Sequence, residues 1–161
     1  MASTVLITQG TRPFAQRVAK LLPAVQTVLF CADELPVVLL RVGNYFKAPS
    51  TDTPAFVHEM LKLCLDNDVD TLIPLGKHEL YAMAEARQLF SEYDIAIWVP
   101  EVADLTALPV IENPPRQLPL LLLHNGTAIT PALYGGHFDT LSGVFTPSDS
   151  GDELALCCIA D

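Results

Sequence analysis

The chain has 161 residues, of which 50% are hydrophobic and 17% charged, and its net charge is −10. This length fits one domain, or one domain with a small appendage, and the acidic balance excludes nucleic acid as an expected partner because nucleic-acid binding needs a basic surface. A membrane span is also excluded, since no apolar run approaches the roughly 20 residues that a membrane helix requires.

The first hundred residues alternate between β-rich runs and amphipathic segments. Residues 4–8 form a β-rich run that ends at Gly10, and a helix with Pro13 in its first turn follows. Further strands are expected at residues 27–31, 45–48, 70–74 and 95–99, and further helices after Pro54 and over residues 77–90. This alternation is typical of βαβ units. It predicts an α/β fold: a Rossmann-like open sheet of about five mostly parallel strands with helices on both faces.

The pattern changes after Pro100. Six prolines fall in residues 101–161, and the dipeptide Asn125-Gly126 supplies the positive φ angles of a type I′ hairpin turn. The apolar runs beside and beyond this turn predict strands at residues 118–124, 127–133, 141–146 and 153–160, with a turn at 148–152. We therefore divide the chain into a Rossmann-like domain over residues 1–101, an irregular crossover over 102–117, and a small antiparallel β appendage over 118–161.

Ligands of open α/β sheets bind beyond the carboxyl ends of the parallel strands. The loop after the first expected strand contains Gly10, Thr11 and Arg12 and leads into a helix. An arginine beside a helix N-terminus could hold a phosphate or a carboxylate, and a tight strand-to-helix turn is the alternative explanation. Because Gly-x-Gly-x-x-Gly is absent, a dinucleotide is disfavoured.

Two further loops carry candidate ligand-binding residues. Asp33 follows the second expected strand, where dinucleotide-binding folds place the acid that holds a ribose hydroxyl, although a capping or solvated turn residue is the alternative. Glu79 suits the first turn of a helix, whereas Lys77 and His78 oppose the helix dipole there. His78 and Glu79 could act as an acid–base pair, but adjacent helical residues point about 100° apart, which favours a structural role.

The histidines, the glycine-rich stretch and the cysteines lack the neighbouring residues that a metal site, a phosphate-binding loop or an activated nucleophile would need. Neither His124 nor His137 has a carboxylate or cysteine at metal-ligand spacing, and Gly135-Gly136-His137 lacks the lysine and helix of a phosphate-binding loop. The four cysteines predict buried, reduced thiols. Together with an N-terminus that lacks the basic start of a signal peptide, they predict a cytoplasmic protein.

Several stretches of residues 4–101 occur in the order and spacing of one known family. They are residues 5–13, 32–33, 45–49, 54–57, 69–74, 79–80 and 84–87. In this order they resemble the N-terminal, pre-ATP-grasp domain of ATP-grasp ligases, in particular standalone proteins related to the carbamoyl-phosphate synthase large subunit. The resemblance implies a Rossmann-like domain that precedes an ATP-grasp domain, in which lysines hold ATP, acidic and asparagine side chains hold magnesium, and a carboxylate is joined to an amine through an acyl phosphate. It also implies that residues 118–133 and the strand near Val144 are an ATP-grasp remnant rather than a complete ATP-grasp domain.

The second half of the chain departs from this family in its charge. No lysine follows Lys77, and Arg116 is the only base among residues 101–161, which carry eight acids. Phosphate charge in a partly dry site requires compensating cations. We therefore expect no cofactor, with ATP and magnesium bound only if a partner supplies the phosphate site, and no catalysis by this chain alone.

These observations predict a non-catalytic module for ligand binding or subunit association, derived from an ATP-grasp ligase. The alternative is the substrate-binding part of a split ATP-dependent carboxylate–amine ligase, which would bind a small carboxylate at Arg12, Asp33 and His78. A mean hydropathy of +0.34 is high and predicts an exposed apolar face. We expect this face to form a homodimer or to meet a separate ATP-grasp subunit.

Overall fold

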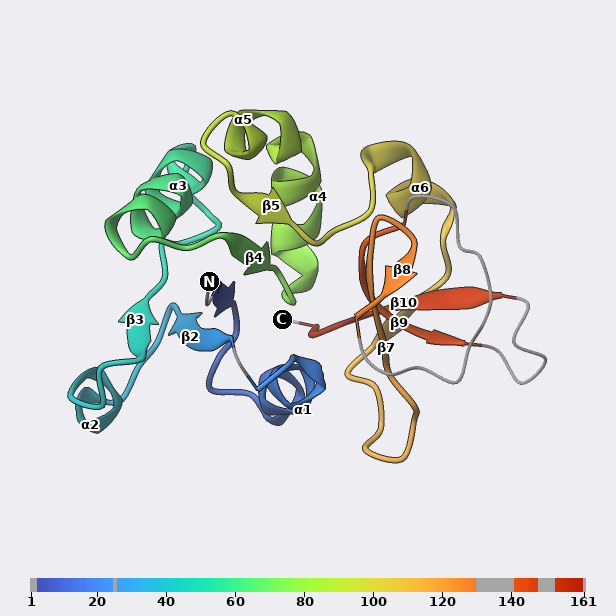
Figure 1. Cartoon of the computed structure of the whole chain (residues 1–161), viewed down its shortest axis with the longest axis horizontal. Helices are drawn as coiled ribbons and strands as arrows, with labels where there is room; N and C mark the ends of the chain where they lie inside the picture. Colours follow the sequence, from blue (N-terminus) through green and yellow to red (C-terminus); the bar gives the residue numbers. More distant parts are fainter. Residues whose placement is uncertain (1–2, 25, 130–140, 148–152, 161) are drawn as a thin grey trace.

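The computed structural model in Figure 1 describes residues 3–24, 26–129, 141–147 and 153–160 and contains two five-stranded sheets. The first sheet has the strand order β3-β2-β1-β4-β5, and all its pairs are parallel. The second has the order β6-β10-β9-β7-β8 and is mixed. The α/β fold predicted from the alternating pattern is confirmed.

The first sheet and its helices alternate along the chain. The strands are β1 (Thr4–Ile7), β2 (Thr27–Ala32), β3 (Tyr45–Lys47), β4 (Thr71–Ile73) and β5 (Ala96–Ile97). The helices are α1 (Pro13–Leu21), α2 (Val37–Leu40), α3 (Phe56–Asp66), α4 (Lys77–Glu85) and α5 (Arg87–Ser91). Two details differ from expectation: the short helix α2 was not predicted, and the helix expected over residues 77–90 is divided at Ala86.

Helices cover both faces of the first sheet, as predicted. Successive side chains of a strand point to opposite faces, so Val5 and Ile7 of β1 pack in one cluster with Val18 of α1. Leu6 points the other way and packs with Met60 of α3 and with the apolar face of α4. Figure 1 shows α1 on one side of the sheet and α3, α4 and α5 on the other. Among the described residues no helix is long and apolar enough to cross a membrane.

The second sheet is formed by the C-terminal part of the chain. It contains β6 (Val110–Glu112), β7 (Leu121–His124), β8 (Thr127–Ala128), β9 (Gly143–Pro147) and β10 (Leu154–Cys158), and α6 (Val102–Ala107) precedes it. The predicted Asn-Gly hairpin is present: β7 pairs antiparallel with β8, and Asn125 and Gly126 have φ angles of 50° and 81°. The remainder of the strand expected at 127–133, the turn at 148–152, and Gly135-Gly136-His137 fall on residues that the structure leaves undescribed.

The appendage is not purely antiparallel, contrary to the prediction. Strand β6 lies in the segment predicted as an irregular crossover, and it pairs in parallel with β10. Its three residues stand between Pro109 and Pro114, so the local pattern indicates a loop. The strand forms because distant β10 supplies the hydrogen-bonding partner.

The two sheets are joined at the carboxyl end of β4. The backbone N–H of Ile159 donates to the carbonyl of Leu75 at 2.8 Å, and the N–H of Lys77 donates to the carbonyl of Ile159 at 2.9 Å. An ion pair between Lys77 and Glu112 spans the same junction. The chain beyond β10 therefore runs alongside the loops in which ligand-binding residues were predicted.

Candidate functional site

A buried hydrogen-bond network ties the loop after β1 to the loop after β4. The hydroxyl of Thr8 donates to Glu79 Oε2 at 2.5 Å and accepts the N–H of Leu75 at 2.8 Å. Glu79 also accepts the N–H of Gly76 at 3.2 Å and the side-chain N–H of Gln9 at 3.1 Å. Its side chain is only 3% exposed, and these donors offset the cost of burying a carboxylate. The geometry therefore gives Glu79 a structural role at the start of α4.

Gly10 is required by the close approach of the β1–α1 turn to β2. A Cβ atom at this position would lie 2.5 Å from the Cβ of Phe30, which is far inside van der Waals contact. The N–H of Gly10 donates to the carbonyl of Cys31 at 2.9 Å, and Gln9 before it has a φ of 54°. The tight-turn explanation accounts for this glycine.

A cavity of about 450 Å³ opens at the carboxyl ends of the parallel strands. Four of the six predicted site residues line it: Arg12 before α1, Asp33 after β2, and His78 and Glu79 at the start of α4. The carboxyl ends of β1, β2 and β4 are neighbours in the sheet, which explains why these distant residues meet. We call this cavity the strand-end cavity.

Acids outnumber lysine and arginine on the wall of the strand-end cavity. Glu34 and Asp52 join Asp33 and Glu79 on its wall, and Arg12 is its only lysine or arginine among the described lining residues. Since Glu79 is held by the buried network, the other three carboxylates define the charge offered to a ligand. This balance disfavours a triphosphate, because carboxylates repel the negatively charged phosphate oxygens.

The other two predicted residues face a neighbouring cavity. Gly10 and Thr11 line a space of about 760 Å³, and Leu35 before α2 and Leu39 within it also line this space. Consecutive residues of the turn thus open onto different cavities, and the structure does not bring Gly10 and Thr11 together with Asp33 and His78.

Helix α2 exposes a run of large apolar side chains. Val37 and Val38 are 66% and 67% exposed, Leu40 is 48% exposed, and Val42 just beyond the helix is 61% exposed. No residue of α2 is buried. We call these four residues the α2 patch. An apolar patch of this kind is unusual on a helix that is exposed to water.

The two basic residues at the start of α4 have different surroundings. Lys77 pairs with Glu112, whose hydrogen bond and negative charge raise the pKa of the Lys77 ammonium group. This pairing offsets the unfavourable position of Lys77 against the helix dipole. His78 is exposed and is the residue of the two that lines the strand-end cavity.

The cysteines are free and buried, as predicted. Burial raises the pKa of Cys64 and of Cys157 to about 12. Burial also raises the pKa of Cys31 well above its usual range, and the negative charge of Glu79 adds to this shift. All three are therefore thiols at neutral pH and weak nucleophiles. Within the described ranges, no three His, Cys, Asp or Glu side chains are grouped so that they could hold a metal ion.

A second polar cavity, which the sequence did not predict, lies between α5 and the β7–β8 hairpin. It measures about 450 Å³, and Arg87 and His124 line it. The ring of His124 stacks on Trp98 with centroids 5.1 Å apart. Arg87 Nη1, His124 Nδ1 and Trp98 Nε1 are buried and have no hydrogen-bond partner in the described structure. Burial, aided by the positive charge of Arg87, lowers the pKa of His124.

The fold alone does not determine the function, because a fold of this kind hosts many unrelated activities. The strand-end cavity combines the largest number of predicted residues with an open position at the sheet edge. No protein-family model matches the chain, and a search of curated proteins likewise finds no match.

Proposed function

We propose that this chain is a non-catalytic module that binds a small zwitterionic carboxylate of amino-acid type in the strand-end cavity. The observation that carries the proposal is the placement of Arg12 on one loop and of Asp33, Glu34 and Asp52 on others around the same cavity. Arginine pairs with a carboxylate through two N–H groups, while the carboxylates attract an ammonium group. The cavity volume of about 450 Å³ suits a small molecule.

The surroundings of the reactive groups support binding without chemical conversion. Glu79 would be the natural general base, but both its oxygens already accept hydrogen bonds from the loop network. Cys31 is buried at the end of β2, and its raised pKa keeps it protonated. His78 remains as a polar wall residue that could contact the ligand.

Descent from an ATP-grasp ligase is part of the proposal. Its support is the order of family-like stretches in residues 4–101. The absence of lysine after Lys77 supports the non-catalytic part of the proposal, because ATP-grasp ligases hold ATP with lysines. A carboxylate–amine ligase acts on ligands that carry these two groups, so the charges around the strand-end cavity also suit the substrate-binding part of a split ligase. In that alternative a partner supplies the ATP and magnesium site, and the isolated chain does not bind Mg-ATP in this cavity.

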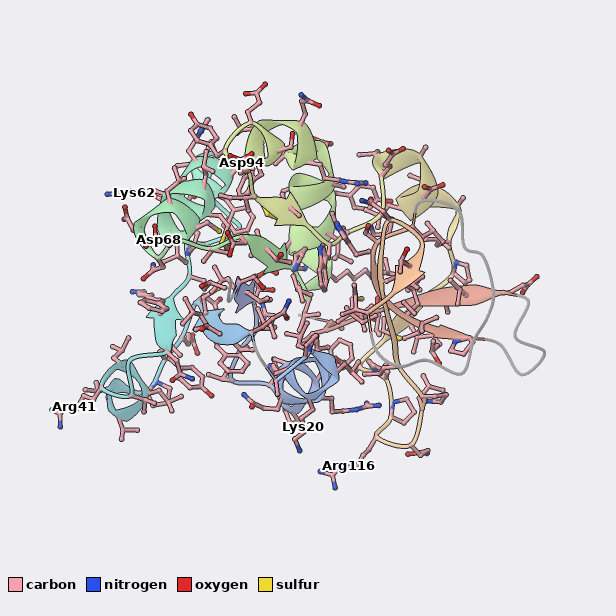
Figure 2. The ribbon with its side chains drawn as sticks, viewed as in Figure 1. Lys20, Arg41, Lys62, Asp68, Asp94 and Arg116 are labelled. Carbon is pink, nitrogen blue, oxygen red and sulfur yellow. The ribbon has the colours of Figure 1, made fainter. Side chains whose placement is uncertain are left out.

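Titration of the full chain with free amino acids, followed by calorimetry, tests the proposal. We expect at least one amino acid to bind with a Kd below about 1 mM, and acetate and methylamine to bind more weakly than that amino acid. Arg12→Gln and Asp33→Asn should each weaken binding by about tenfold, which corresponds to about 1.4 kcal/mol. Lys62→Gln and Asp68→Asn are matched controls, since both residues lie on or beside α3, away from the cavity (Figure 2). If no amino acid binds, or if the control variants weaken binding as much as Arg12→Gln and Asp33→Asn do, the proposal is rejected.

The α2 patch favours self-association as a second property of the module. Four large apolar side chains on one short segment suit an isologous contact, in which the same patch of two copies meets across a twofold axis. Sedimentation velocity should show a dimer that Val38→Glu converts to a monomer. Leu65→Glu, at a single 44% exposed position on α3, should leave the dimer intact. A wild-type chain that stays monomeric at all concentrations would exclude the homodimer.

A further inference from the structure

Three of the chain's nine lysine and arginine residues line one groove beside α1. Arg17 and Lys20 come from α1, and Arg116 comes from the loop between β6 and β7. The groove has a volume of about 670 Å³, and its described lining contains no carboxylate. Figure 2 shows Lys20 and Arg116 near each other at the same edge of the molecule, both directed outward. A chain with more than twice as many acids as bases thus presents one purely cationic groove.

Arg17 holds Arg116 in this position. Its guanidinium donates to the carbonyl of Leu118 at 2.7 Å, to that of Pro115 at 3.1 Å, and to that of Pro114 at 3.4 Å. These acceptors lie on both sides of Arg116 in the sequence, so the loop that carries Arg116 is fastened against α1. The single arginine of the second half is thereby brought beside Lys20, although nearly a hundred residues separate them.

The positive charges of the groove are not neutralised within the described structure. The ion pair found there joins Lys77 to Glu112, and no carboxylate lies within 4.0 Å of a charged nitrogen of Arg17, Lys20 or Arg116. Carbonyl oxygens accept the hydrogen bonds of Arg17 but carry no net charge. Holding three like charges around one groove costs Coulomb free energy, and a bound anion would remove that cost.

We propose that this groove binds a phosphate-bearing small molecule. Arginine presents paired N–H groups that match phosphate oxygens, and lysine adds a compact positive charge. Thr11 places a hydroxyl group on the same lining. The groove volume is within the range of small-molecule sites, and the acidic remainder of the chain disfavours a polynucleotide.

This groove is separate from the strand-end cavity, where the amino-acid ligand is proposed to bind. The groove and the strand-end cavity share no lining residue. Two of the three groove cations come from α1, and the second half of the chain contributes one arginine.

Calorimetric titration of the full chain with pyrophosphate at low ionic strength tests the inference. We expect a Kd below about 1 mM that rises with added salt, with inorganic phosphate binding more weakly. Lys20→Gln and Arg116→Gln should each weaken pyrophosphate binding by about fivefold or more, and the double variant further. Lys62→Gln and Arg41→Gln remove exposed cations elsewhere on the surface (Figure 2) and should change binding by less than about twofold.

The variants remove only exposed side chains, so circular dichroism should show folded proteins with unchanged thermal midpoints. Absence of pyrophosphate binding, or equal weakening by the control variants, overturns the proposal. Citrate serves as a carboxylate probe of similar charge. If citrate binds as tightly as pyrophosphate, the assignment to phosphate is wrong.

Discussion

Replacing Thr8 by valine tests the network that holds the candidate site together. Thr8 is fully buried, with an exposed fraction of 0%. Its hydroxyl links Leu75 and Glu79, as acceptor at 2.8 Å and donor at 2.5 Å. Valine keeps the branched shape but has no polar atom, so the N–H of Leu75 loses its acceptor and the carboxylate of Glu79 loses a donor.

The expected destabilisation follows from these two losses. A hydrogen bond to a charged group contributes about 1.5–3 kcal/mol, and a buried N–H without an acceptor costs about 1–3 kcal/mol. The more apolar valine recovers about 1 kcal/mol, which leaves a net loss of about 1.5–5 kcal/mol. With an m-value near 2 kcal/mol/M, the urea midpoint falls by roughly 0.8–2.5 M. Thr8→Ser is the matched control, because it keeps the hydroxyl and loses one methyl group, at a cost of about 1 kcal/mol.

Urea unfolding followed by circular dichroism measures both variants, with the fluorescence of Trp98, the single tryptophan of the chain, as a second probe. The valine variant should be less stable than the serine variant by about 0.5–4 kcal/mol. If valine is equal to serine, or more stable than threonine, the hydroxyl does not stabilise the loops and the structural role given to Glu79 is wrong.

Three further substitutions probe the turn, the fastened loop and the stacked histidine. Gly10→Ala places a Cβ atom 2.5 Å from Phe30 and should cost about 1–3 kcal/mol or more through overpacking; an unchanged thermal midpoint would contradict this. Arg17→Ala removes the hydrogen bonds to three loop carbonyls. It should increase amide hydrogen exchange at residues 116–118 and proteolysis of this loop while the β4 amides stay protected; a uniform increase in exchange would show a global effect instead. Burial and the charge of Arg87 lower the pKa of His124 in the folded state. In the unfolded chain the pKa of this histidine is about 6.5. Above that pH both states hold a neutral His124, and as the pH falls below it the unfolded state gains a proton first, so the fold loses stability. His124→Phe keeps a ring against Trp98 and should lose less stability than wild type between about pH 7 and pH 5 in urea titrations, whereas parallel losses would assign the pH dependence to other groups.

The parallel sheet could be predicted because its signals are local. Each strand of the first sheet is a short apolar run followed by a helix, and such units pack in a limited number of ways. The meeting of Arg12, Asp33 and His78 at one cavity follows from the same rule, since the loops after neighbouring parallel strands share one edge of the sheet. The hairpin turn could be predicted for the same reason, because the dipeptide Asn125-Gly126 itself favours the positive φ angles that the turn has.

The features that escaped prediction depend on distant partners. Strand β6 forms because β10 pairs with it, and the position of Arg116 beside Lys20 depends on contacts that Arg17 makes about a hundred residues away. The stack of His124 on Trp98 joins the two sheets. Periodicity reports which residues share a face of one element, but it carries no information on which elements meet.

Charge separates the two binding chemistries proposed for this chain. Four carboxylates and one arginine line the strand-end cavity, whereas three cations and no described carboxylate line the groove. A polyphosphate is therefore repelled from the first site and attracted to the second. If Mg-ATP binds this chain at all, Arg116→Gln should weaken its binding and Asp33→Asn should not. The reverse result would place the phosphates at the strand ends and would contradict the charge argument for both sites.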